Sequence, residues 1–571
     1  MSIKGNTDMK KTFILFAFLI GVLLTVLISC SDKQTNPAST AGADTTNAST
    51  DTAVTTAPSE VGETDIGEYK IVRSDSSSKA IIAYVKVLKN EIASSLDSTL
   101  SVATDYIRNK DENVDGIKEI LIGKTNRSES EEAYGELSAS DSKDSFVIRV
   151  SENKIVILGL DDNMTAKGVK YFIDNIVKKS DKEGIISIGE GYSIEQKADP
   201  DTVVFDNLTE MKIEFSSDIF VPRDETTSNI YEYPTIVRLQ YQEKEENNGK
   251  FLATFERGGG TYGIYESNDD GKNWSYIGAV KDRLNKDYCS EWMPFLYELP
   301  ADIGEYKRGT VILAATSRST PGDFDKSTIT LYASTDLGRT FSAFCNVDEA
   351  GGLEWGVWEP FLIYDEETRR IYCFYADDSD PEHSQKLVYK YSTDLVNWSE
   401  LKECVACSEY SLRPGMISIT KMGNGEYYMV FEMVGIEGNP IYAKRTKDLD
   451  NWGDISDYGE IVAAKGKTFG SSPYTLWIPA GGECGTLIVV GKHPISGTSS
   501  TGTDMFVSFD YGKTFEPIDN PIPYTLVGHD RASYSPSLFA SPDGEAFYYA
   551  NCPDYGDATY KISFVKIKII E

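Results

Sequence analysis

The stretch WEPFLIYDEETRRIYCFYADDSDPEHSQKLVYKYSTDLVNW, residues 358–398, decides the fold, because its two features recur along the chain. The first feature is an apolar strand opened by a proline, a position where no ladder hydrogen bond is lost. A period of about 50 to 70 residues between such strands is typical of propeller blades. The strand opens at Pro234, Pro294, Pro360, Pro414, Pro473 and Pro536, with successive spacings of 60, 66, 54, 59 and 63 residues. Six copies predict a mainly β fold, a six-bladed β-propeller over residues 200–571.

The second feature is a turn of the form Ser-x-Asp-x-Gly-x-Thr, followed by Trp or Phe. Its aspartate is expected to accept hydrogen bonds from the N–H groups of the turn, and its glycine permits positive φ. Good copies are SNDDGKNW from Ser267, STDLGRTF from Ser334 and SFDYGKTF from Ser508, and looser copies are STDLVNW from Ser392 and TKDLDNW from Thr446. These turns resemble the Asp boxes, or BNR repeats, of sialidases, and we predict a structural role for them.

Five turns for six prolines indicate how the ring closes. A sixth turn would fall beyond Glu571, so the last blade is predicted to lack a fourth strand at the C-terminal end. The run TVVFDNLTEMKIEF, residues 202–215, is expected to fill that place and close the propeller. A closed ring leaves no exposed sheet edge.

Residues 65–197 are predicted to form a small α/β domain ahead of the propeller. Apolar residues at helical spacing predict helices over 79–96 and 165–177, and short apolar runs at 119–123, 145–150 and 154–160 predict strands. The unit resembles the small α/β domain that precedes the catalytic domain in some bacterial glycoside hydrolases. It shows no catalytic constellation, and we expect a spacer or packing domain.

The start of the chain reads as an export signal. Lys10 and Lys11 precede an apolar run that ends in Leu-Ile-Ser before Cys30. This resembles the bacterial lipoprotein lipobox, with residues 1–29 as signal peptide and Cys30 as the lipidated residue. Residues 30–64 are rich in Ser, Thr and Ala and are predicted to be a flexible linker. We therefore expect an extracytoplasmic protein held on the cell surface by its lipid anchor, the only membrane contact predicted.

Composition narrows the partners. A net charge of −33 argues against nucleic acid, which requires clustered Lys and Arg. The three histidines, His383, His493 and His529, are scattered, so no metal site is predicted and no cofactor is expected. Structural calcium bound by backbone carbonyls remains open, since it leaves no sequence trace. The pair Cys404 and Cys407 has no second pair at ligand spacing and is interpreted as core.

In a meander blade, the start of the first strand and the end of the second strand lie at the same mouth of the channel. The residues before the prolines are Tyr233, Met293, Glu359, Arg413, Ser472 and Ser535. The second strands are expected to end near Glu256, Ser317, Ala376 with Asp377, Glu432, Lys492 and Asn551. Two glutamates on adjacent blades stand out, Glu359 and Glu432, with Arg413 between them. Cleavage of a glycosidic bond needs two carboxylates, so this mouth is the candidate active site.

Residues 358–398, together with RPGMISITKMGNGEYYMVFE (413–432), resemble the exo-α-1,5-L-arabinanases of glycoside hydrolase family 93, six-bladed propellers of the wider sialidase-like group. The resemblance implies a retaining mechanism that releases short arabino-oligosaccharides from the non-reducing end of arabinan. It implies Glu359 as nucleophile and Glu432 as general acid/base. Neighbouring residues that could line the sugar pocket, or hold its loops, are Trp358, Asp378, Asp380, His383, Gln385, Lys386 and Arg413, with Tyr534 and Arg531 as weaker candidates.

Two other functions compete with this hypothesis. A sialidase needs an arginine cluster and a Tyr–Glu nucleophile pair, and its first arginine stands where this chain has Glu232. A carboxylate there would repel an anionic sugar. The second alternative is a glycan-binding lipoprotein that uses the propeller mouth without catalysis; it keeps the aromatic residues but does not need both glutamates.

Overall fold

The structure is a computed structural model. It describes residues 62–107, 114, 116–140, 143–200, 202–222, 231–257, 261–280, 282–284, 288–319, 326–351, 356–492, 504–522, 533–553 and 561–570. The predicted signal peptide, Cys30 and residues 30–61 of the linker lie outside these ranges, as do His493, His529 and Arg531. Among the described residues, no helix combines the length and the apolar character needed to cross a membrane.

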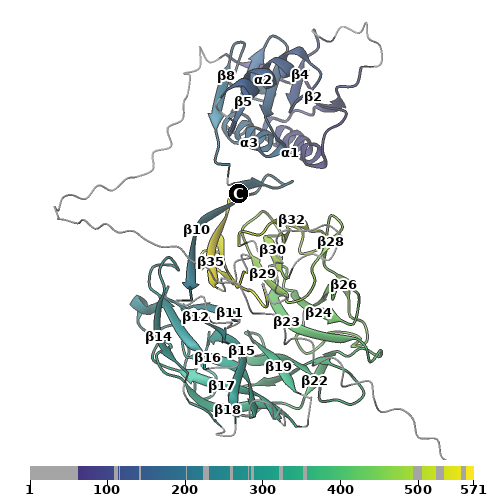
Figure 1. The fold of residues 1–571 in the computed structure, drawn as a ribbon. Helices are drawn as coiled ribbons and strands as arrows, with labels where there is room; N and C mark the ends of the chain where they lie inside the picture. Colours follow the sequence, from purple (N-terminus) through teal and green to yellow (C-terminus); the bar gives the residue numbers. More distant parts are fainter. Residues whose placement is uncertain are drawn as a thin grey trace, which may run out of the picture. The chain divides into compact units, whose positions relative to one another are not determined.

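The centre of the α/β domain is a six-stranded sheet in the order β3-β2-β4-β6-β5-β8 (Figure 1). The first four strands in this order are parallel, and β5 and β8 are antiparallel to their neighbours. The strands are β2 (Lys70–Arg73), β3 (Ser101–Thr104), β4 (Glu119–Ile122), β5 (Ser145–Ser151), β6 (Lys154–Gly159) and β8 (Ser193–Lys197). A separate short pair joins β1 (Thr64–Asp65) to β7 (Ile185–Ile186). The three predicted strands are confirmed as β4, β5 and β6.

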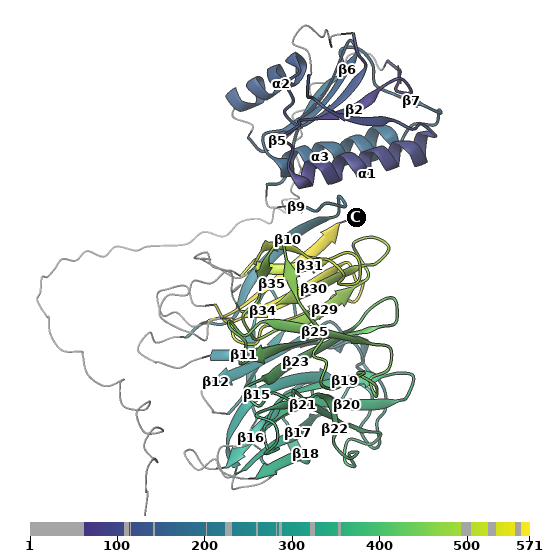
Figure 2. The ribbon, with the colours of Figure 1, turned by 90° about the vertical axis from the view of Figure 1, so that its right-hand side faces the viewer.

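Helices cover both faces of this sheet (Figure 2). α1 (Lys79–Leu96) and α3 (Asp162–Phe172) pack on one face, in an apolar cluster that includes Leu88, Ile92 and Phe172. α2 (Ser128–Ala139) packs Ala133 and Leu137 on the other face. Both faces of the central strands are therefore buried, as parallel sheets require.

The predicted helices are confirmed, and one was missed. α1 matches the predicted 79–96 at both ends. Its first end is fixed by Ser78, whose hydroxyl accepts a hydrogen bond from the Ile81 N–H at 3.1 Å. The second helix begins at Asp162 rather than 165 and continues as a π-helix, Ile173–Val177. α2 was not predicted, because only three of its residues are buried and its apolar period is weak.

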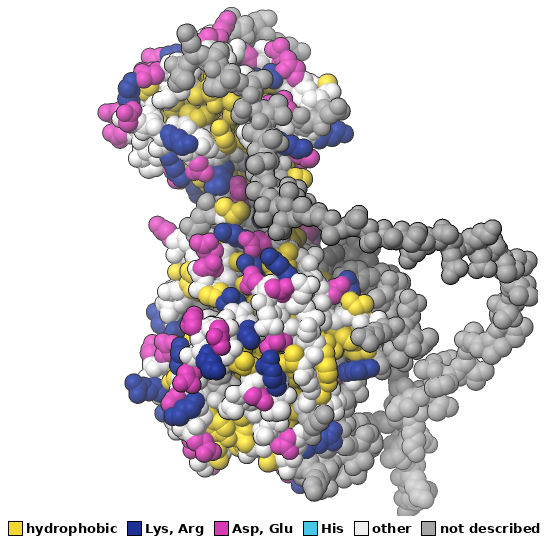
Figure 3. All heavy atoms as spheres, turned by 90° about the vertical axis from the view of Figure 1, so that its left-hand side faces the viewer, with side chains coloured by type: hydrophobic (Ala, Val, Ile, Leu, Met, Phe, Trp, Pro, Cys, Tyr) yellow, Lys and Arg dark blue, Asp and Glu magenta, His cyan; other side chains and the backbone are white. Residues whose placement is uncertain are grey.

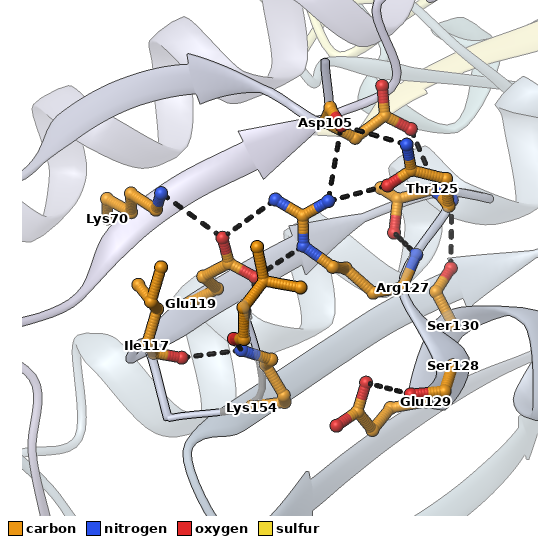
Figure 4. A network of polar contacts seen from close by, with 12 residues as sticks. Lys70, Asp105, Ile117, Glu119, Thr125, Arg127, Ser128, Glu129, Ser130 and Lys154 are labelled. Atoms are coloured by element: carbon orange, nitrogen blue, oxygen red, sulfur yellow. Dashed lines mark hydrogen bonds and ion pairs between the residues drawn. The ribbon is translucent and has the colours of Figure 1, made fainter. Parts of the chain in front are cut away.

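A buried ionic network links the strands of this domain (Figure 4). Glu119, the first residue of β4, is fully buried and meets three cations. Its carboxylate lies 2.8 Å from Nε of Arg127 and 3.2 Å from the ammonium groups of both Lys70 and Lys154. Arg127 also donates to the main-chain oxygen of Asp105 at 3.2 Å. Every ion in the network has a partner of opposite charge, which is the condition for burying charge.

The rest of the described chain forms six antiparallel sheets, the blades of a propeller (Figure 1). Blade 1 comprises β11 (Tyr231–Arg238), β12 (Phe251–Arg257), β13 (Gly263–Ser267) and β14 (Ser275–Ala279), and blade 2 comprises β15 (Tyr288–Glu298), β16 (Val311–Ser319), β17 (Lys326–Ser334) and β18 (Ser342–Gly351). Blade 3 comprises β19 (Val357–Asp365), β20 (Arg370–Asp377), β21 (Lys386–Ser392) and β22 (Lys402–Val405), and blade 4 comprises β23 (Arg413–Lys421), β24 (Tyr427–Val434), β25 (Ile441–Thr446) and β26 (Glu460–Ile461). Blade 5 comprises β29 (Tyr474–Ile478), β30 (Thr486–Val490), β31 (Asp504–Ser508) and β32 (Glu516–Asp519). A hairpin of β27 (Ala463–Ala464) and β28 (Lys467–Thr468) and a 3-10 turn, η2 (Glu245–Asn247), complete the connections.

The sixth blade closes the ring with a strand from the start of the propeller. β33 (Ser537–Ala540), β34 (Ala546–Asn551) and β35 (Ile562–Ile570) are followed in the sheet by β10 (Glu210–Phe220) and the short β9 (Val203–Val204). β10 pairs antiparallel with β35 along nearly its whole length. The predicted closure is confirmed, although the closing strand runs to Phe220, beyond the predicted 202–215.

The Asp-containing turns hold their loops as predicted. In the turn after β17, the Ser334 hydroxyl donates to Asp336 at 2.8 Å and accepts from the Gly338 N–H at 2.9 Å. Asp336 in turn accepts from the Thr340 N–H at 2.9 Å. The turns at Ser267 and Ser508 repeat these contacts, and the looser turn at Ser392 keeps most of them without a glycine.

Candidate active site

Each inner strand has a residue with positive φ, which lies inside the strand at a β-bulge in blades 1–4 and two residues before the strand in blades 5 and 6. A bulge bends the strand and redirects a side chain. The six residues are Tyr233, Met293, Glu359, Met416, Ser472 and Ser535, with φ between 52° and 60°. They occupy equivalent positions at one mouth of the channel, which makes this ring the frame of the candidate site.

Blade 4 departs from the prediction. The predicted ring residue there was Arg413, but the bulge lies at Met416, because Gly415 pairs with Glu432 and the next pair is Ser418 with Val430. Pro414 therefore precedes the bulge by two residues, whereas the other prolines follow it directly. Arg413 consequently stands outside the ring of bulge residues.

The second strand of each blade also contributes one residue to this mouth, and the pairing of the first and second strands identifies that residue. Trp358 pairs with Ala376 in blade 3 as Gly415 pairs with Glu432 in blade 4. The equivalent residues around the mouth are Glu256, Thr316, Ala376, Glu432, Lys492 and Cys552. The predicted Ser317 and Asn551 each miss this ring by one residue.

Glu359 extends from the bulge of blade 3 and is held from two other blades. Its Oε1 accepts a hydrogen bond from the Tyr233 hydroxyl at 2.9 Å. Its Oε2 accepts from the main-chain N–H of Met416 at 2.9 Å. Two donors from blades 1 and 4 thus fix the orientation of this carboxylate at the mouth.

Glu432 is 7% exposed and is held from blade 5. Its Oε2 accepts hydrogen bonds from the hydroxyl of Ser471 and from the N–H of Ser472, the latter at 3.2 Å. Gly415 faces its other oxygen, since a Cβ at this position would lie 3.3 Å from Oε1. The same Cβ would lie 2.7 Å from Nε2 of Gln385, so a larger residue here would have to displace the amide of Gln385.

Burial shifts the pKa of both carboxyl groups. Burial and then the charge of Glu432 raise the pKa of Glu359 to about 7, against the hydrogen bonds from Tyr233 and Met416 and the charge of Arg413. Burial also raises the pKa of Glu432, against the bonds from Ser471 and Ser472 and the charges of Lys492 and Arg413. Raised pKa values make it easier for one carboxyl group of such a pair to keep a proton while the other is ionised.

Aromatic rings of three inner strands lie close to one another near the candidate site. Phe361 lies two residues after Glu359, and its ring centroid is 4.8 Å from that of Phe295 and 6.3 Å from that of Tyr474. The three rings come from blades 2, 3 and 5.

The structure connects several of the predicted pocket residues. An Arg413 guanidinium nitrogen lies 2.7 Å from Oε1 of Gln385 and 3.7 Å from the Asp378 carboxylate. Gln385 in turn donates to the main-chain oxygen of Pro414 at 2.8 Å. Burial raises the pKa of Asp378, which accepts hydrogen bonds from the Gly356 N–H and the Trp358 side chain. These contacts tie the blade 3 residues to the start of blade 4.

Three other predicted residues hold loops. The ammonium of Lys386 pairs with Asp380 at 2.6 Å and with Glu403 at 2.7 Å. His383 Nδ1 lies 2.9 Å from the main-chain oxygen of Cys407. Both sets of contacts lie within or beside blade 3. They fit the loop-holding role, one of the two roles that the sequence allowed for these residues.

Four residues of the site were not singled out as such from the sequence: Tyr233, Met416, Ser471 and Ser472. Tyr233 and Ser472 both stood in the predicted ring, and their positions before Pro234 and Pro473 were the available signal. Met416 and Ser472 act through main-chain N–H groups, which no side-chain motif reveals. Tyr534, a predicted candidate, packs its ring 5.3 Å from that of Tyr233 and accepts a hydrogen bond from the Tyr233 N–H at 3.2 Å.

The described residues contain no group of three His, Cys, Asp or Glu side chains that could hold a metal ion. Cys404 and Cys407 are both buried in the apolar cluster of blades 3 and 4, as the core interpretation predicted. On the face drawn in Figure 3, acidic and basic side chains of the described residues are interspersed. That face offers no broad basic surface of the kind that nucleic acid requires.

Solved structures similar to this chain include an arabinanase and an arabinofuranosidase. The α-L-arabinanase of Penicillium chrysogenum, in complex with arabinobiose, is 29% identical and has a TM-score of 0.53 over 62% of this chain and 98% of its own. The α-L-arabinofuranosidase of Fusarium graminearum, with an iminosugar inhibitor, is 26% identical with a TM-score of 0.51 over 62% and 97% of the two chains. The same enzyme, described as a member of glycoside hydrolase family 93 and bound to arabinobiose, gives 26% and 0.50 over 61% and 96%.

The other two comparisons give no match. No family model matches the chain, and no curated protein sequence matches it. The solved structures described above, family 93 arabinanases and arabinofuranosidases, share the six-bladed propeller with this chain.

Proposed function

We propose that this chain is an extracellular glycoside hydrolase that cleaves α-1,5-linked arabinan from the chain end with retention of configuration. The observation that carries the proposal is the pair Glu359 and Glu432, two carboxyl groups at one propeller mouth, each fixed by two hydrogen-bond donors. The neighbours solved with arabinobiose support an arabinose-containing substrate.

The proposed chemistry requires one proton on the two carboxyl groups. Glu432, protonated, gives its proton to the glycosidic oxygen while the Glu359 carboxylate attacks the anomeric carbon. Glu432, now ionised, then takes a proton from water, and the water oxygen displaces Glu359. Tyr233 and the Met416 N–H hold the attacking carboxylate in place, and Ser471 and the Ser472 N–H hold the acid/base.

The geometry also argues against a tyrosine nucleophile, the sialidase alternative. Tyr233 and Glu359 do form a Tyr–Glu pair, with the phenol oxygen 2.9 Å from the carboxylate. Burial raises the pKa of Tyr233 well above its usual range, and the charges of Glu359, Glu256 and Glu232 raise it further. A phenol in these surroundings stays protonated and donates its hydrogen to Glu359. Glu232 is also buried here, where a sialidase would need its arginine.

The experiment uses the full-length chain, purified in detergent, with linear 1,5-arabinan and a sialyl-lactose control. The proposal would be supported if the native chain released short arabino-oligosaccharides and the variants Glu359→Gln and Glu432→Gln released none. Proton NMR of the first product reads its anomeric configuration and tests retention. Release of free sialic acid would show that arabinan is the wrong substrate. Binding of arabinan without any product would favour a glycan-binding protein.

The lipid anchor is a separate proposal that rests on the sequence around Cys30. Native chain should sediment with membranes and incorporate labelled fatty acid. Cys30→Ser should abolish the label, while a chain that still carries it would overturn this site of attachment.

A further inference from the structure

Lys492 stands at the mouth in the position that Glu432 occupies one blade earlier. β30 ends at Val490, which pairs with Tyr474, so Lys492 follows in the same register as Glu432 in β24. Its N–H donates to the main-chain oxygen of Ser471 at 2.9 Å. Ser471 is the residue whose hydroxyl bonds Glu432, and its φ of 112° is unusual for a residue with a side chain. The backbone of Lys492 therefore holds Ser471 in the strained conformation that serves Glu432.

The ammonium of Lys492 is also placed by contact. It lies 5.1 Å from the ring centroid of Tyr534, within the range of a cation–π interaction. The Tyr534 ring lies against Tyr233, whose hydroxyl holds Glu359. The main chain of Lys492 thus contacts Ser471, which orients Glu432. Its ammonium contacts Tyr534, which packs against Tyr233, the residue that orients Glu359.

Four titratable or charged groups face Glu432 from the surrounding strands: Glu359 of β19, Arg413 of β23, Lys492 after β30 and Tyr534 before β33. Burial keeps Tyr534 protonated, and the charges of Glu432 and Glu359 add to this by raising its pKa further. Arg413 lowers the pKa of both carboxyl groups, so it does not distinguish them. The charge of Lys492 lowers the pKa of Glu432, so Lys492 favours the ionised form of Glu432 within the pair.

We propose that Lys492 is a positioning residue that stabilises Glu432 as a carboxylate once its proton has moved to the departing sugar. This inference rests on the proposed function and deepens it. In the first step the proton of Glu432 passes to the glycosidic oxygen, the glycosidic bond breaks and Glu359 bonds to the anomeric carbon. In the second step water attacks that carbon, its proton passes to Glu432 and Glu359 leaves. Lys492 keeps its proton throughout and compensates the charge that Glu432 carries between the two steps.

The test compares Lys492→Met with Lys492→Arg in the full-length chain. Without the cation the pKa of Glu432 rises, so the alkaline limb of kcat/KM on a linear arabino-oligosaccharide should move up by about one pH unit. Lys492→Arg should leave the limb near its native position. With an aryl arabinofuranoside, whose leaving group needs no proton, Lys492→Met should keep the initial burst of phenol. It should slow the steady state up to about tenfold at a pH below the raised pKa of Glu432, because a smaller fraction of Glu432 is then ionised and able to take a proton from water.

A second measurement separates this inference from the proposed function. The Glu432 carboxyl can be titrated by infrared difference spectroscopy, with its band assigned by Glu432→Gln, and Lys492→Met should raise the midpoint even if arabinan is not the substrate. Lys513→Met, at an exposed position of the same blade, is the matched control and should leave the midpoint unchanged. Thermal melting checks that each variant is folded. A folded Lys492→Met with an unchanged midpoint and alkaline limb would overturn the inference, and so would a change confined to KM.

Discussion

The phenol oxygen of Tyr233 lies 2.9 Å from Oε1 of Glu359, so a residue of blade 1 donates a hydrogen bond to a carboxylate of blade 3. Both residues occupy bulge positions of their inner strands, with φ of 52° and 60°. A strand without a bulge would direct these side chains differently. The proposed nucleophile is therefore oriented by the backbone conformation of two blades.

Tyr233→Phe should lower kcat/KM on arabinan about 100-fold, the effect of removing one preorganised hydrogen-bond donor. The lost bond favoured the ionised form of Glu359, so the pKa of Glu359 should rise. Since attack requires the carboxylate, the acid limb of the pH profile should move to higher pH. Steady-state kinetics across pH measures both effects.

Tyr276→Phe is the control, because Tyr276 is an exposed tyrosine of the same blade and should tolerate the change. If Tyr233 were itself the nucleophile, its loss would cost more than about 10⁴-fold. A fall of that size in folded Tyr233→Phe would contradict the role that we give to Glu359.

The blades could be predicted from the sequence because proline and the Asp turn each have a local physical reason. The inner strands of blades 1–4 begin before their prolines rather than at them as predicted, but in blades 1–3 the proline lies at a bulge, where it costs the ladder little. Asp336 accepts a hydrogen bond from an N–H group within its own turn. α1 was predicted because its buried face repeats along the sequence, as Leu88 and Ile92 show. α2 was missed because Ala133 and Leu137 supply too few apolar positions.

The site was predicted in part, and the errors have one origin. Glu359 and Glu432 were found because carboxylates at a channel mouth are unusual and have a chemical use. Arg413 was misplaced because Pro414 precedes the blade 4 bulge at Met416 by two residues, and the position of a bulge depends on pairing with β24. The donors from Met416 and Ser472 come from neighbouring blades, a relationship that no local pattern contains.

The ionic network of Figure 4 predicts how the α/β domain responds to Glu119→Gln. The carboxylate is fully buried among Lys70, Arg127 and Lys154, so its loss leaves buried cations uncompensated and should cost about 3–5 kcal/mol of folding free energy. The cations and the hydrogen bond from Arg127 lower the pKa of Glu119 below its ordinary value, against burial, which raises it. Its contribution is therefore present above the ordinary pKa and lost as the pH falls through the lowered value.

Urea unfolding at neutral and at acidic pH measures this contribution, and Glu131→Gln, exposed on α2, is the control. The gap in stability between native and Glu119→Gln should narrow in acid. An unchanged gap across pH would mean that the network stabilises the domain by shape and packing rather than by charge.

The Asp turns should contribute to stability without affecting catalysis. Ser334 is buried, and its hydroxyl bonds both Asp336 and the Gly338 N–H, so Ser334→Ala leaves a buried donor unsatisfied. We expect a loss of about 1–3 kcal/mol in unfolding free energy and an unchanged kcat on arabinan. Ser342→Ala, exposed at the start of β18, should change neither. A fall in kcat with full stability would assign these turns a catalytic role.

Gly415 is the position where a single methyl group tests the geometry of the acid/base. Its Cβ would lie 2.7 Å from Nε2 of Gln385 and 3.3 Å from Oε1 of Glu432, so Gly415→Ala must displace one of the two side chains. We expect kcat/KM to fall about 100-fold, because a misplacement of about 1 Å is sufficient for such a loss, while thermal stability changes little. Gly135→Ala, in α2 with open space around the new methyl group, is the control and should leave both quantities intact. Full activity in Gly415→Ala would show that Glu432 does not act from the position described above.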